Sequence, residues 1–245
     1  MIGDARVALA FLTRLPVGDG RPLDAATLSR AALWFPAVGL LVGAIMGGTR
    51  LLADLALEPG PATVLALLAA LLVTGALHED GLADLADGAG AHAARERKLE
   101  IMRDPRVGTY GALALGFALL FAYAVLSDLD GEHVLRAALA GHVLGRFSTL
   151  PQSLLLAPAR PDGSGALLRA SPLATLAAGA FAVAVTLLAA GVGAGLIALG
   201  VAALLTLGGA LFCRRILGGS TGDGYGAVTK VVELGTYAAL AAAWG

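Results

Sequence analysis

The chain has 245 residues, of which 58% are apolar and 14% are charged, and its formal net charge is −1. Soluble globular domains average about 45–50% apolar and about 25% charged residues, so this composition indicates an integral membrane protein. The near-zero net charge argues against nucleic acid as the main partner. The single cysteine, Cys213, excludes an intrachain disulfide and a cysteine-based zinc site. We expect no signal peptide, because Asp4 and Arg6 lie in the N-terminal segment without a cleavage pattern.

The predicted elements begin with a short interfacial helix over residues 4–15, which Pro16 stops. Apolar runs close to the roughly 20 residues of a transmembrane helix follow it. They cover residues 33–53, 61–78, 109–127, 134–156, 172–190, 194–213 and 228–244, and the second and seventh are short. No polar block is long enough to fold separately. The sequence therefore predicts an all-α polytopic integral membrane protein with about seven transmembrane helices and a single membrane-embedded domain, residues 1–245.

Two patterns concern the packing and the orientation of these helices. Gly39, Gly43 and Gly47 recur at four-residue spacing on the first span, which is typical of helices that pack closely in lipid. If the spans alternate, fourteen Lys and Arg residues fall on one side and only Arg50 and Arg136 on the other. Positive residues concentrate in cytoplasmic connections, so we expect a cytoplasmic N-terminus and an outside C-terminus. The fourteen are Arg6, Arg14, Arg21, Arg30, Arg95, Arg97, Lys98, Arg103, Arg106, Arg160, Arg169, Arg214, Arg215 and Lys230.

The stretch HEDGLADLADG, residues 78–88, gathers acids at the end of the second apolar run. Asp80, Asp84 and Asp87 stand at i, i+4 and i+7. If the second span continues as a helix past His78, all three carboxylates project from one face. Like charges so close repel one another, so a cation should lie between them. Oxygen-only ligands favour a hard cation such as Mg²⁺.

An alternative interpretation of this stretch is a solvated acidic loop that happens to follow a span. The helical spacing, the flanking Gly81 and Gly88, and the lack of interspersed Lys or Arg favour the metal site. Glu79 points elsewhere on the same helix, so its role is weaker. His78 either hydrogen-bonds one of the metal-binding carboxylates or is an ordinary interfacial residue.

Two later stretches fall on the same predicted side of the membrane. KLEIMRDPRVGTYGALAL, residues 98–115, carries Arg103 and Arg106, whose guanidinium groups suit phosphate recognition, although the charge asymmetry of membrane loops would also place arginines there. GGSTGDGYGA, residues 218–227, combines glycines that let backbone N–H groups approach an anion with Asp223, a further candidate metal ligand. This second stretch lacks the ending of a Walker motif, and a plain connecting loop would also be rich in glycine.

A pair of opposite charges is expected between two of the predicted spans. Arg146 belongs to the fourth run, and an unpaired charge in hydrocarbon is costly, so it requires a partner. Glu233, in the seventh run, is the candidate, and the pair would be structural.

Three stretches carry a resemblance to a known family: HEDGLADLADG, EIMRDPRVGTYGALAL and GGSTGDGYGA. In this order and at this spacing they resemble the motifs of the cobalamin synthase family, also called adenosylcobinamide-GDP ribazoletransferases. FLTRLPVG near the N-terminus and WFPAVGLLVGA at the start of the first span match the same family, so the resemblance covers nearly the whole chain. It implies a Mg²⁺-dependent, phosphotransferase-type enzyme of late vitamin B12 assembly. Such an enzyme lies in the bacterial inner membrane with its active site on the cytoplasmic face.

The reaction implied by the resemblance joins adenosylcobinamide-GDP to α-ribazole or α-ribazole 5′-phosphate, releases GMP and gives adenosylcobalamin or its phosphate. Membrane lipid is the other implied partner, while association with other cobamide-assembly enzymes and homo-oligomer formation stay open. As a hypothesis, Mg²⁺ neutralises the charge of the departing GMP and one of the two arginines clamps the GDP part. An acid is frequent in the family where Lys230 stands, so a carboxylate role at that position is in doubt.

The resemblance and the chemistry of the residues together give the expected site residues, of which His78 and Arg106 rest on the chemistry alone. The expected catalytic residues are Asp80, Asp84, Asp87 and His78, the last as an alternative general base. The expected substrate-binding residues are Arg103, Asp104, Arg106, Thr109, Thr221, Gly222 and Asp223. The expected metal ligands are Asp80, Asp84, Asp87, Asp223 and Glu233.

Three other functions compete with this one. The acidic stretch is chemically similar to the signature of CDP-alcohol phosphotransferases, but residues 82–88, LADLADG, lack that family's Ala-Arg pair and its longer spacing. A transporter or channel would need polar residues along a path through the spans, and few are present besides His142, Arg146 and Glu233. A non-catalytic membrane scaffold leaves the three motifs on one side of the membrane unexplained.

Overall fold

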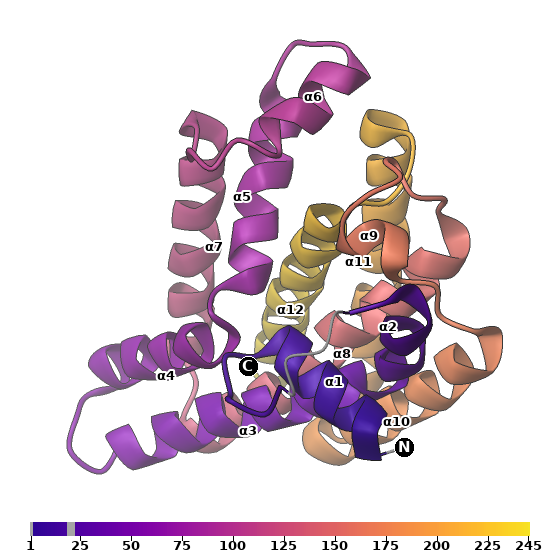
Figure 1. Cartoon of the computed structure of the whole chain (residues 1–245). Coiled ribbons are helices and arrows are strands. Elements are labelled where there is room, and N and C mark those ends of the chain that lie inside the picture. The colour runs from indigo at the N-terminus through magenta and orange to yellow at the C-terminus, as the bar shows by residue number, and fades with distance from the viewer. Residues whose placement is uncertain (1, 19–22) are drawn as a thin grey trace.

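The computed structural model describes residues 2–18 and 23–245, and in these residues it contains helices, loops and one isolated bridge between Pro158 and Ser220. The elements are α1 (Ile2–Leu12), α2 (Ala25–Ala31), the 3₁₀ turn η1 (Ala32–Trp34), α3 (Phe35–Ala53), α4 (Pro59–Thr74), α5 (Leu77–Gly90), α6 (Arg95–Ile101), α7 (Thr109–Ser127), α8 (Gly131–Leu155), α9 (Ser164–Leu167), α10 (Pro172–Ala190), α11 (Val192–Leu217) and α12 (Gly222–Trp244). The all-α class is confirmed for the described residues (Figure 1). The expected N-terminal helix corresponds to α1, and Arg21 lies outside the described residues.

Each predicted apolar run is helical, but fewer than seven helices have the length and composition of a membrane span. In the described part of the chain, four segments do: residues 25–53, α7, α10 and α11. The bent pair α4–α5 makes a fifth if it is counted as one span. The helices α8 and α12 coincide with two further predicted runs, but both carry buried polar residues that face the protein interior. The count of seven therefore stays a prediction.

The chain is helical past His78 as expected, but the second predicted run is not one continuous helix. Helix α4 ends at Thr74, and Gly75 and Ala76 follow in left-handed conformation, with φ of 63° and 57°. Helix α5 then starts at an angle of 87° to α4. Glycine commonly ends a helix in this conformation, whereas alanine adopts it only at a cost of about 1–2 kcal/mol. We call this bend the elbow; the acidic residues follow it on the separate helix α5.

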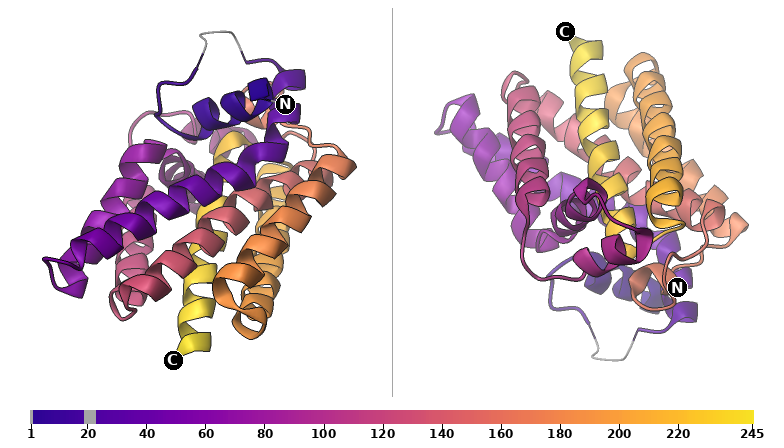
Figure 2. Two further views of the ribbon diagram at one scale, coloured as in Figure 1. Left: turned by 90° about the horizontal axis from the view of Figure 1, so that it is seen from below. Right: turned by 90° about the horizontal axis from the view of Figure 1, so that it is seen from above.

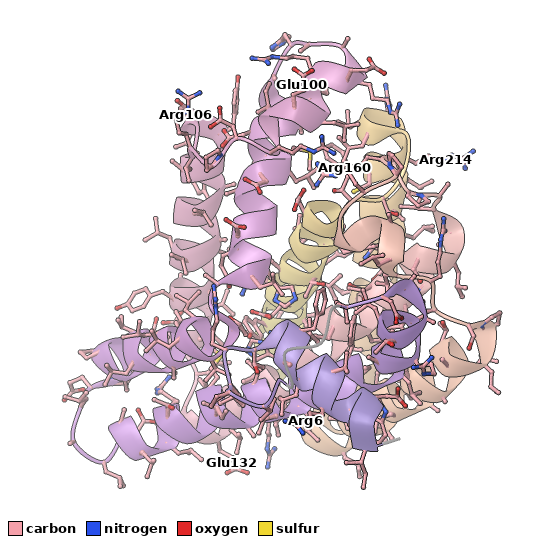
Figure 3. The ribbon with its side chains drawn as sticks, in the orientation of Figure 1. Arg6, Glu100, Arg106, Glu132, Arg160 and Arg214 are labelled. Atoms are coloured by element: carbon pink, nitrogen blue, oxygen red, sulfur yellow. The ribbon has the colours of Figure 1, made fainter. Side chains whose placement is uncertain are left out.

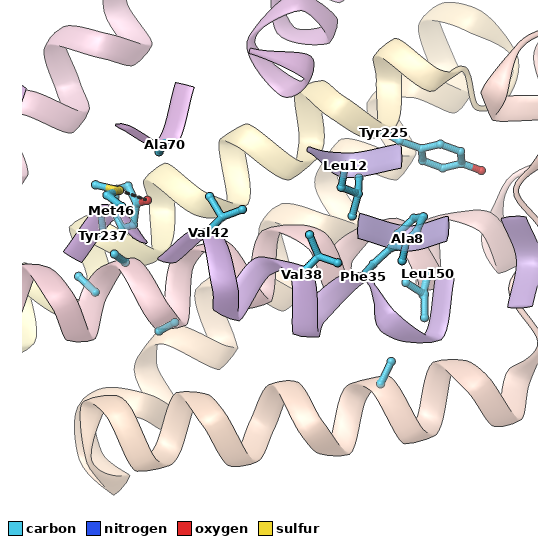
Figure 4. Packing of buried hydrophobic residues seen from close by; sticks show 14 of the residues in the cluster. Ala8, Leu12, Phe35, Val38, Val42, Met46, Ala70, Leu150, Tyr225 and Tyr237 are labelled. Carbon is cyan, nitrogen blue, oxygen red and sulfur yellow. Dashed lines mark hydrogen bonds between the residues drawn. The ribbon is translucent and has the colours of Figure 1, made fainter. Parts of the chain in front are cut away.

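Close helix packing at the predicted glycine repeat is confirmed. Helix α3 packs along α8, and a Cβ atom added at Gly43 would lie 2.5 Å from the backbone oxygen of Ala138 on α8. Gly39 and Gly47 meet the same helix at a similarly short distance. On the side of α3 that faces the core, Val38, Val42 and Met46 are buried (Figure 4).

The arrangement leaves α5 between α7 and α12, with α6 at its C-terminal end (Figure 1). The N-terminal helices and the C-terminal end of α12 lie at opposite ends of the molecule (Figure 2). The N-terminal end of α12 meets α5, and the candidate site is built around this meeting point.

Candidate active site

Two glycines bring the backbones of α5 and α12 together. A Cβ atom added at Gly81 of α5 would lie 2.8 Å from the backbone oxygen of Asp223, at the start of α12. From the other side, a Cβ atom at Gly226 would lie 3.5 Å from the Cα atoms of Gly81 and His78. This close approach places the acids in the middle of α5 beside the N-terminal turn of α12.

The carboxylates of Asp80, Asp84 and Asp223 form the centre of the candidate site, which we call the acidic cluster. Asp84 is partly buried, and Asp223 is its strongest negatively charged neighbour, followed by Asp80 and Asp87. Burial raises the pKa of Asp223, Arg160 opposes this rise, and the charge of Asp80 adds to it. Carboxylates from two helices thus repel one another here, and a bound cation would relieve that repulsion.

Arg160 is the cation beside this cluster. Its Nη2 atom donates a hydrogen bond to Asp223 Oδ2 at 3.0 Å, and its attraction also reaches Asp84. Its Nη1 atom is buried and has no hydrogen-bond partner among the described residues. Figure 3 shows Arg160 between the ribbons of α5 and α11. The arginine is therefore held at the cluster with one donor group unused.

Asp87 has a different environment from the other aspartates on α5. Its two carboxylate oxygens accept hydrogen bonds from the backbone N–H groups of Gly108, at 2.7 Å, and Gly111, at 2.8 Å. These are unsatisfied donors at the N-terminus of α7, where a carboxylate is stabilising. A Cβ atom at either glycine would lie 2.4 Å from an oxygen of the Asp87 carboxylate, which would have to shift to make room. Asp87 thus fixes the start of α7 against α5.

The second motif lies at the surface, beyond Asp87. Arg103 donates to both oxygens of Asp162 at 2.6 Å, and Arg106 is paired with Asp104 at 2.7 Å. Hydrogen bonds from the Arg106 side chain and backbone lower the pKa of Asp104 to about 2. Thr109 is exposed at the first turn of α7. Both arginines are thus paired with carboxylates at the surface. A negatively charged ligand would have to displace Asp162 from Arg103 or Asp104 from Arg106.

The third motif shapes the start of α12. Thr221 is the N-cap residue, and its hydroxyl accepts from the N–H of Gly224 at 2.9 Å, while Gly222 begins the helix. The hydroxyl of Tyr225 donates to Ser220 at 2.9 Å, and Ser220 belongs to the bridge with Pro158. These contacts fix the start of α12, which carries Asp223, against the connection that carries Arg160.

Glu233 lies in a buried network of charges, separate from the surface motifs. Arg146 donates to Glu233 Oε2 at 2.9 Å, which confirms the pair expected from the sequence. His142 lies 2.8 Å from the same oxygen, and Lys230 binds both Glu233 Oε1, at 2.5 Å, and Glu79 Oε1, at 2.6 Å. Both oxygens of Glu233 are therefore occupied by cationic or histidine partners. This geometry is that of a structural residue.

His78 belongs with this network as well. Its side chain is buried, and its charged neighbours are Arg146, Glu233 and Lys230. One of the two interpretations of His78 was a hydrogen bond to a carboxylate of the acidic cluster. Among the described residues, His78 forms no such bond.

Comparison with known proteins identifies the family to which these motifs belong. A family model described as cobalamin-5-phosphate synthase matches residues 4–241. The chain belongs to this family. A relative from Mesorhizobium japonicum, named adenosylcobinamide-GDP ribazoletransferase, is 43% identical over 96% of this chain and 91% of its own length. Relatives of the same name from Bradyrhizobium diazoefficiens and Shewanella amazonensis are 41% and 39% identical, over 96% and 97% of the chain and 91% and 94% of their own lengths. No solved structure matches the chain.

Within this member of the cobalamin-5-phosphate synthase family, the structure selects among the expected site residues. It brings together Asp80, Asp84 and Asp223, and it places Glu233 in a different cluster. It also adds Arg160, which the sequence indicates only as one of many cations on the expected cytoplasmic side. The sequence gives one signal for Arg160, its place in the polar connection between α8 and α10, but no motif includes it.

The chemistry of the acidic cluster fits Mg²⁺. Its donors are all carboxylate oxygens, and Mg²⁺ usually binds one or two carboxylates together with water and substrate phosphates. Among the described residues, no three acids, histidines or cysteines lie close enough together to hold a metal ion by themselves. Two carboxylates could hold Mg²⁺ if the phosphates of a bound substrate supplied the remaining ligands.

Proposed function

We propose that the chain is an adenosylcobinamide-GDP ribazoletransferase. It transfers the adenosylcobinamide-phosphate group of adenosylcobinamide-GDP to a hydroxyl of α-ribazole or α-ribazole 5′-phosphate and releases GMP. The observation that carries this proposal is the meeting of Asp84 and Asp223, from two helices, beside Arg160 in a chain of this family. Transfer of a group from a pyrophosphate needs carboxylates that hold a divalent ion and a guanidinium with a free donor.

Each group of the site has a task in this reaction. The attacking hydroxyl forms a bond to the phosphorus that stays with cobinamide, and the bond from that phosphorus to the oxygen of GMP breaks. Arg160 donates its free Nη1–H groups to the pyrophosphate and so orients it for attack. Asp80, the exposed member of the cluster, accepts the proton of the hydroxyl at a carboxylate oxygen.

Asp84 and Asp223 are the residues that would hold Mg²⁺. When bound, the ion would neutralise negative charge on the pyrophosphate and on the departing GMP. Support for this assignment comes from the repulsion between the two carboxylates and from their place beside Arg160. Glu233 is left out of the metal set because Arg146, His142 and Lys230 occupy its oxygens.

For the membrane arrangement, we propose seven spans in a bacterial inner membrane, with the N-terminus and the active site on the cytoplasmic side. The charge asymmetry of the connections supports this orientation, and the seven helices at the predicted runs support the count. A cysteine placed at Gly245, in a chain whose Cys213 is replaced by Ala, tests it. A membrane-impermeant maleimide should label this cysteine in intact spheroplasts, and labelling only after lysis would reverse the orientation.

The deciding experiment is an assay of the purified full-length protein in detergent. Adenosylcobinamide-GDP, α-ribazole and Mg²⁺ are supplied together, and GMP release and the corrinoid product are followed. We expect both to form in equal amounts and to depend on all three components. A parallel reaction with CDP-diacylglycerol and an alcohol should give no CMP. Absence of the corrinoid product from folded protein would overturn the proposal.

A further inference from the structure

A hollow of about 550 Å³ lies at the elbow, between the C-terminal end of α1, the start of α5 and α7. We call it the elbow hollow, and the residues that matter in it are Phe11, Arg14, Leu77, Glu79, Asp80 and Leu115. Ligand sites in proteins commonly span about 300–1,000 Å³. Asp80 borders both this hollow and the acidic cluster, so a molecule bound here would reach the reaction centre.

Arg14 provides the positive end of the hollow. Its backbone N–H donates to the carbonyl of Val73 at 2.7 Å, which ties the end of the N-terminal segment to α4. Its side chain lies across Gly75, at the position that a Cβ atom there would occupy. The guanidinium is exposed and forms no ion pair with any residue in the described part of the chain. The elbow thus presents an unpaired arginine to the hollow.

Glu79 and Asp80 provide acceptor groups in the same hollow. Glu79 Oε1 binds Lys230, while Glu79 Oε2 is buried and has no hydrogen-bond partner among the described residues. A buried carboxylate oxygen without a partner is costly, and a ligand hydroxyl would satisfy it. Asp80, the next residue, is exposed. Phe11, Leu77 and Leu115 supply apolar surface in the hollow.

This combination matches one of the two substrates. A nucleoside 5′-phosphate has an anionic end, ribose hydroxyls in the middle and a flat apolar base, and its size suits 550 Å³. A corrinoid linked to GDP is several times larger and carries its pyrophosphate to the acidic cluster, where Arg160 already offers a donor.

On the basis of the proposed function, we infer that the elbow hollow is the acceptor site and that it takes α-ribazole as its 5′-phosphate. Arg14 binds the phosphate group, Glu79 Oε2 accepts from a ribose hydroxyl, and the aromatic base lies against Phe11 and Leu115. The attacking ribose hydroxyl is thereby brought to Asp80. Arg14 is thus a specificity-determining residue, which makes the phosphorylated nucleoside the better acceptor.

The test compares two acceptors in two assays, with the full-length protein in detergent. KM is measured for α-ribazole 5′-phosphate, α-ribazole and adenosylcobinamide-GDP in the unsubstituted protein, Arg14→Met and Arg14→Lys. Direct binding of α-ribazole 5′-phosphate is measured by equilibrium dialysis without the second substrate. Arg136→Met is the matched control, because Arg136 is an arginine on α8 that does not line the hollow.

We expect Arg14→Met to raise KM and the dissociation constant for α-ribazole 5′-phosphate by about ten- to a hundredfold, the size of a lost charged hydrogen bond. KM for α-ribazole and for adenosylcobinamide-GDP should change less than about threefold, and Arg14→Lys should restore part of the loss. The inference is overturned if Arg14→Met weakens both acceptors equally, or if it changes neither. If binding depends on Arg14 but no transfer occurs, the inference stands and the proposed function fails.

Discussion

The Arg160 guanidinium lies 3.0 Å from the Asp223 carboxylate, a pairing between the connection that follows α8 and the first turn of α12, at positions 63 residues apart in the chain. It links an acid of the family motifs to a guanidinium that no motif contains. Because Arg160 also competes with a metal ion for the same carboxylate, its removal should affect the two ligands of the site in opposite directions.

Substitution of Arg160 by Met is predicted to raise KM for adenosylcobinamide-GDP and to lower the Mg²⁺ concentration at half-maximal rate. Loss of a charged hydrogen bond costs about 1.5–3 kcal/mol, which corresponds to about ten- to a hundredfold in KM. Without the guanidinium, Asp223 is freer to bind the cation. Steady-state kinetics at several Mg²⁺ concentrations measure both effects, with Arg214→Met, at an exposed residue of α11, as control. Parallel changes in the two constants would contradict the assignment.

Asp84→Asn is predicted to abolish Mg²⁺-dependent turnover without loss of folded protein. The amide keeps the shape of the side chain and removes the negative charge that a hard cation requires. GMP release measures turnover, and size-exclusion chromatography in detergent with the thermal transition measures folding. Asp128→Asn, at an exposed position after α7, serves as the matched control. Near-normal turnover of the Asp84 variant would remove Asp84 from the metal site.

Glu233→Gln is predicted to lower stability strongly, because it leaves Arg146 and Lys230 buried without their common carboxylate. Removal of one partner of a buried ion pair costs about 3–5 kcal/mol. Glu132→Gln is the control, since Glu132 forms an exposed pair with Arg136, and such pairs contribute about 0–1 kcal/mol. The midpoint of thermal unfolding in detergent distinguishes the two. A variant that keeps its stability but loses Mg²⁺ affinity would return Glu233 to the metal ligands.

Gly43→Ala is predicted to destabilise the packing of α3 on α8, because its new methyl group would lie 2.5 Å from the backbone oxygen of Ala138. Overpacking of this kind costs about 1–3 kcal/mol. Gly48→Ala, on the same helix, meets nothing within 4 Å and should be neutral or slightly stabilising, since alanine is the better helix former. The thermal midpoints of the two variants give the comparison. Equal midpoints would mean that the two helices separate easily.

Much of the fold followed from the sequence, because apolar runs and glycine spacing are local patterns. The helices at the predicted runs and the contact of Gly39, Gly43 and Gly47 with α8 are examples. The elbow was missed because a glycine at the end of an apolar run neither fixes the direction of the next helix nor predicts a left-handed alanine at position 76. The number of spans also depends on contacts between distant segments. Helices α8 and α12 carry charges that a lone span would not tolerate, and these charges pair with each other in the fold.

The candidate site was predicted only in part, for a similar reason. The helical spacing of Asp80 and Asp84 and the acid in the third motif are visible in the sequence. The roles of Asp87, Arg160 and Lys230 depend on partners far along the chain: Gly108 and Gly111, Asp223, and Glu79. Such pairings arise from the way α5, α7 and α12 meet, which no single motif contains.

The elbow between α4 and α5 decides on which side of the membrane every later residue lies. If the bent pair α4–α5 crosses the bilayer, it adds one membrane span; if it turns back, it adds none. With a crossing pair among seven passages, Lys and Arg divide fourteen to two between the sides; with a returning pair they divide eleven to five. The sharper division favours crossing. Helix α5 would then form the cytoplasmic end of that passage beside α7 and α12, so that its four acids lie against protein and away from acyl chains.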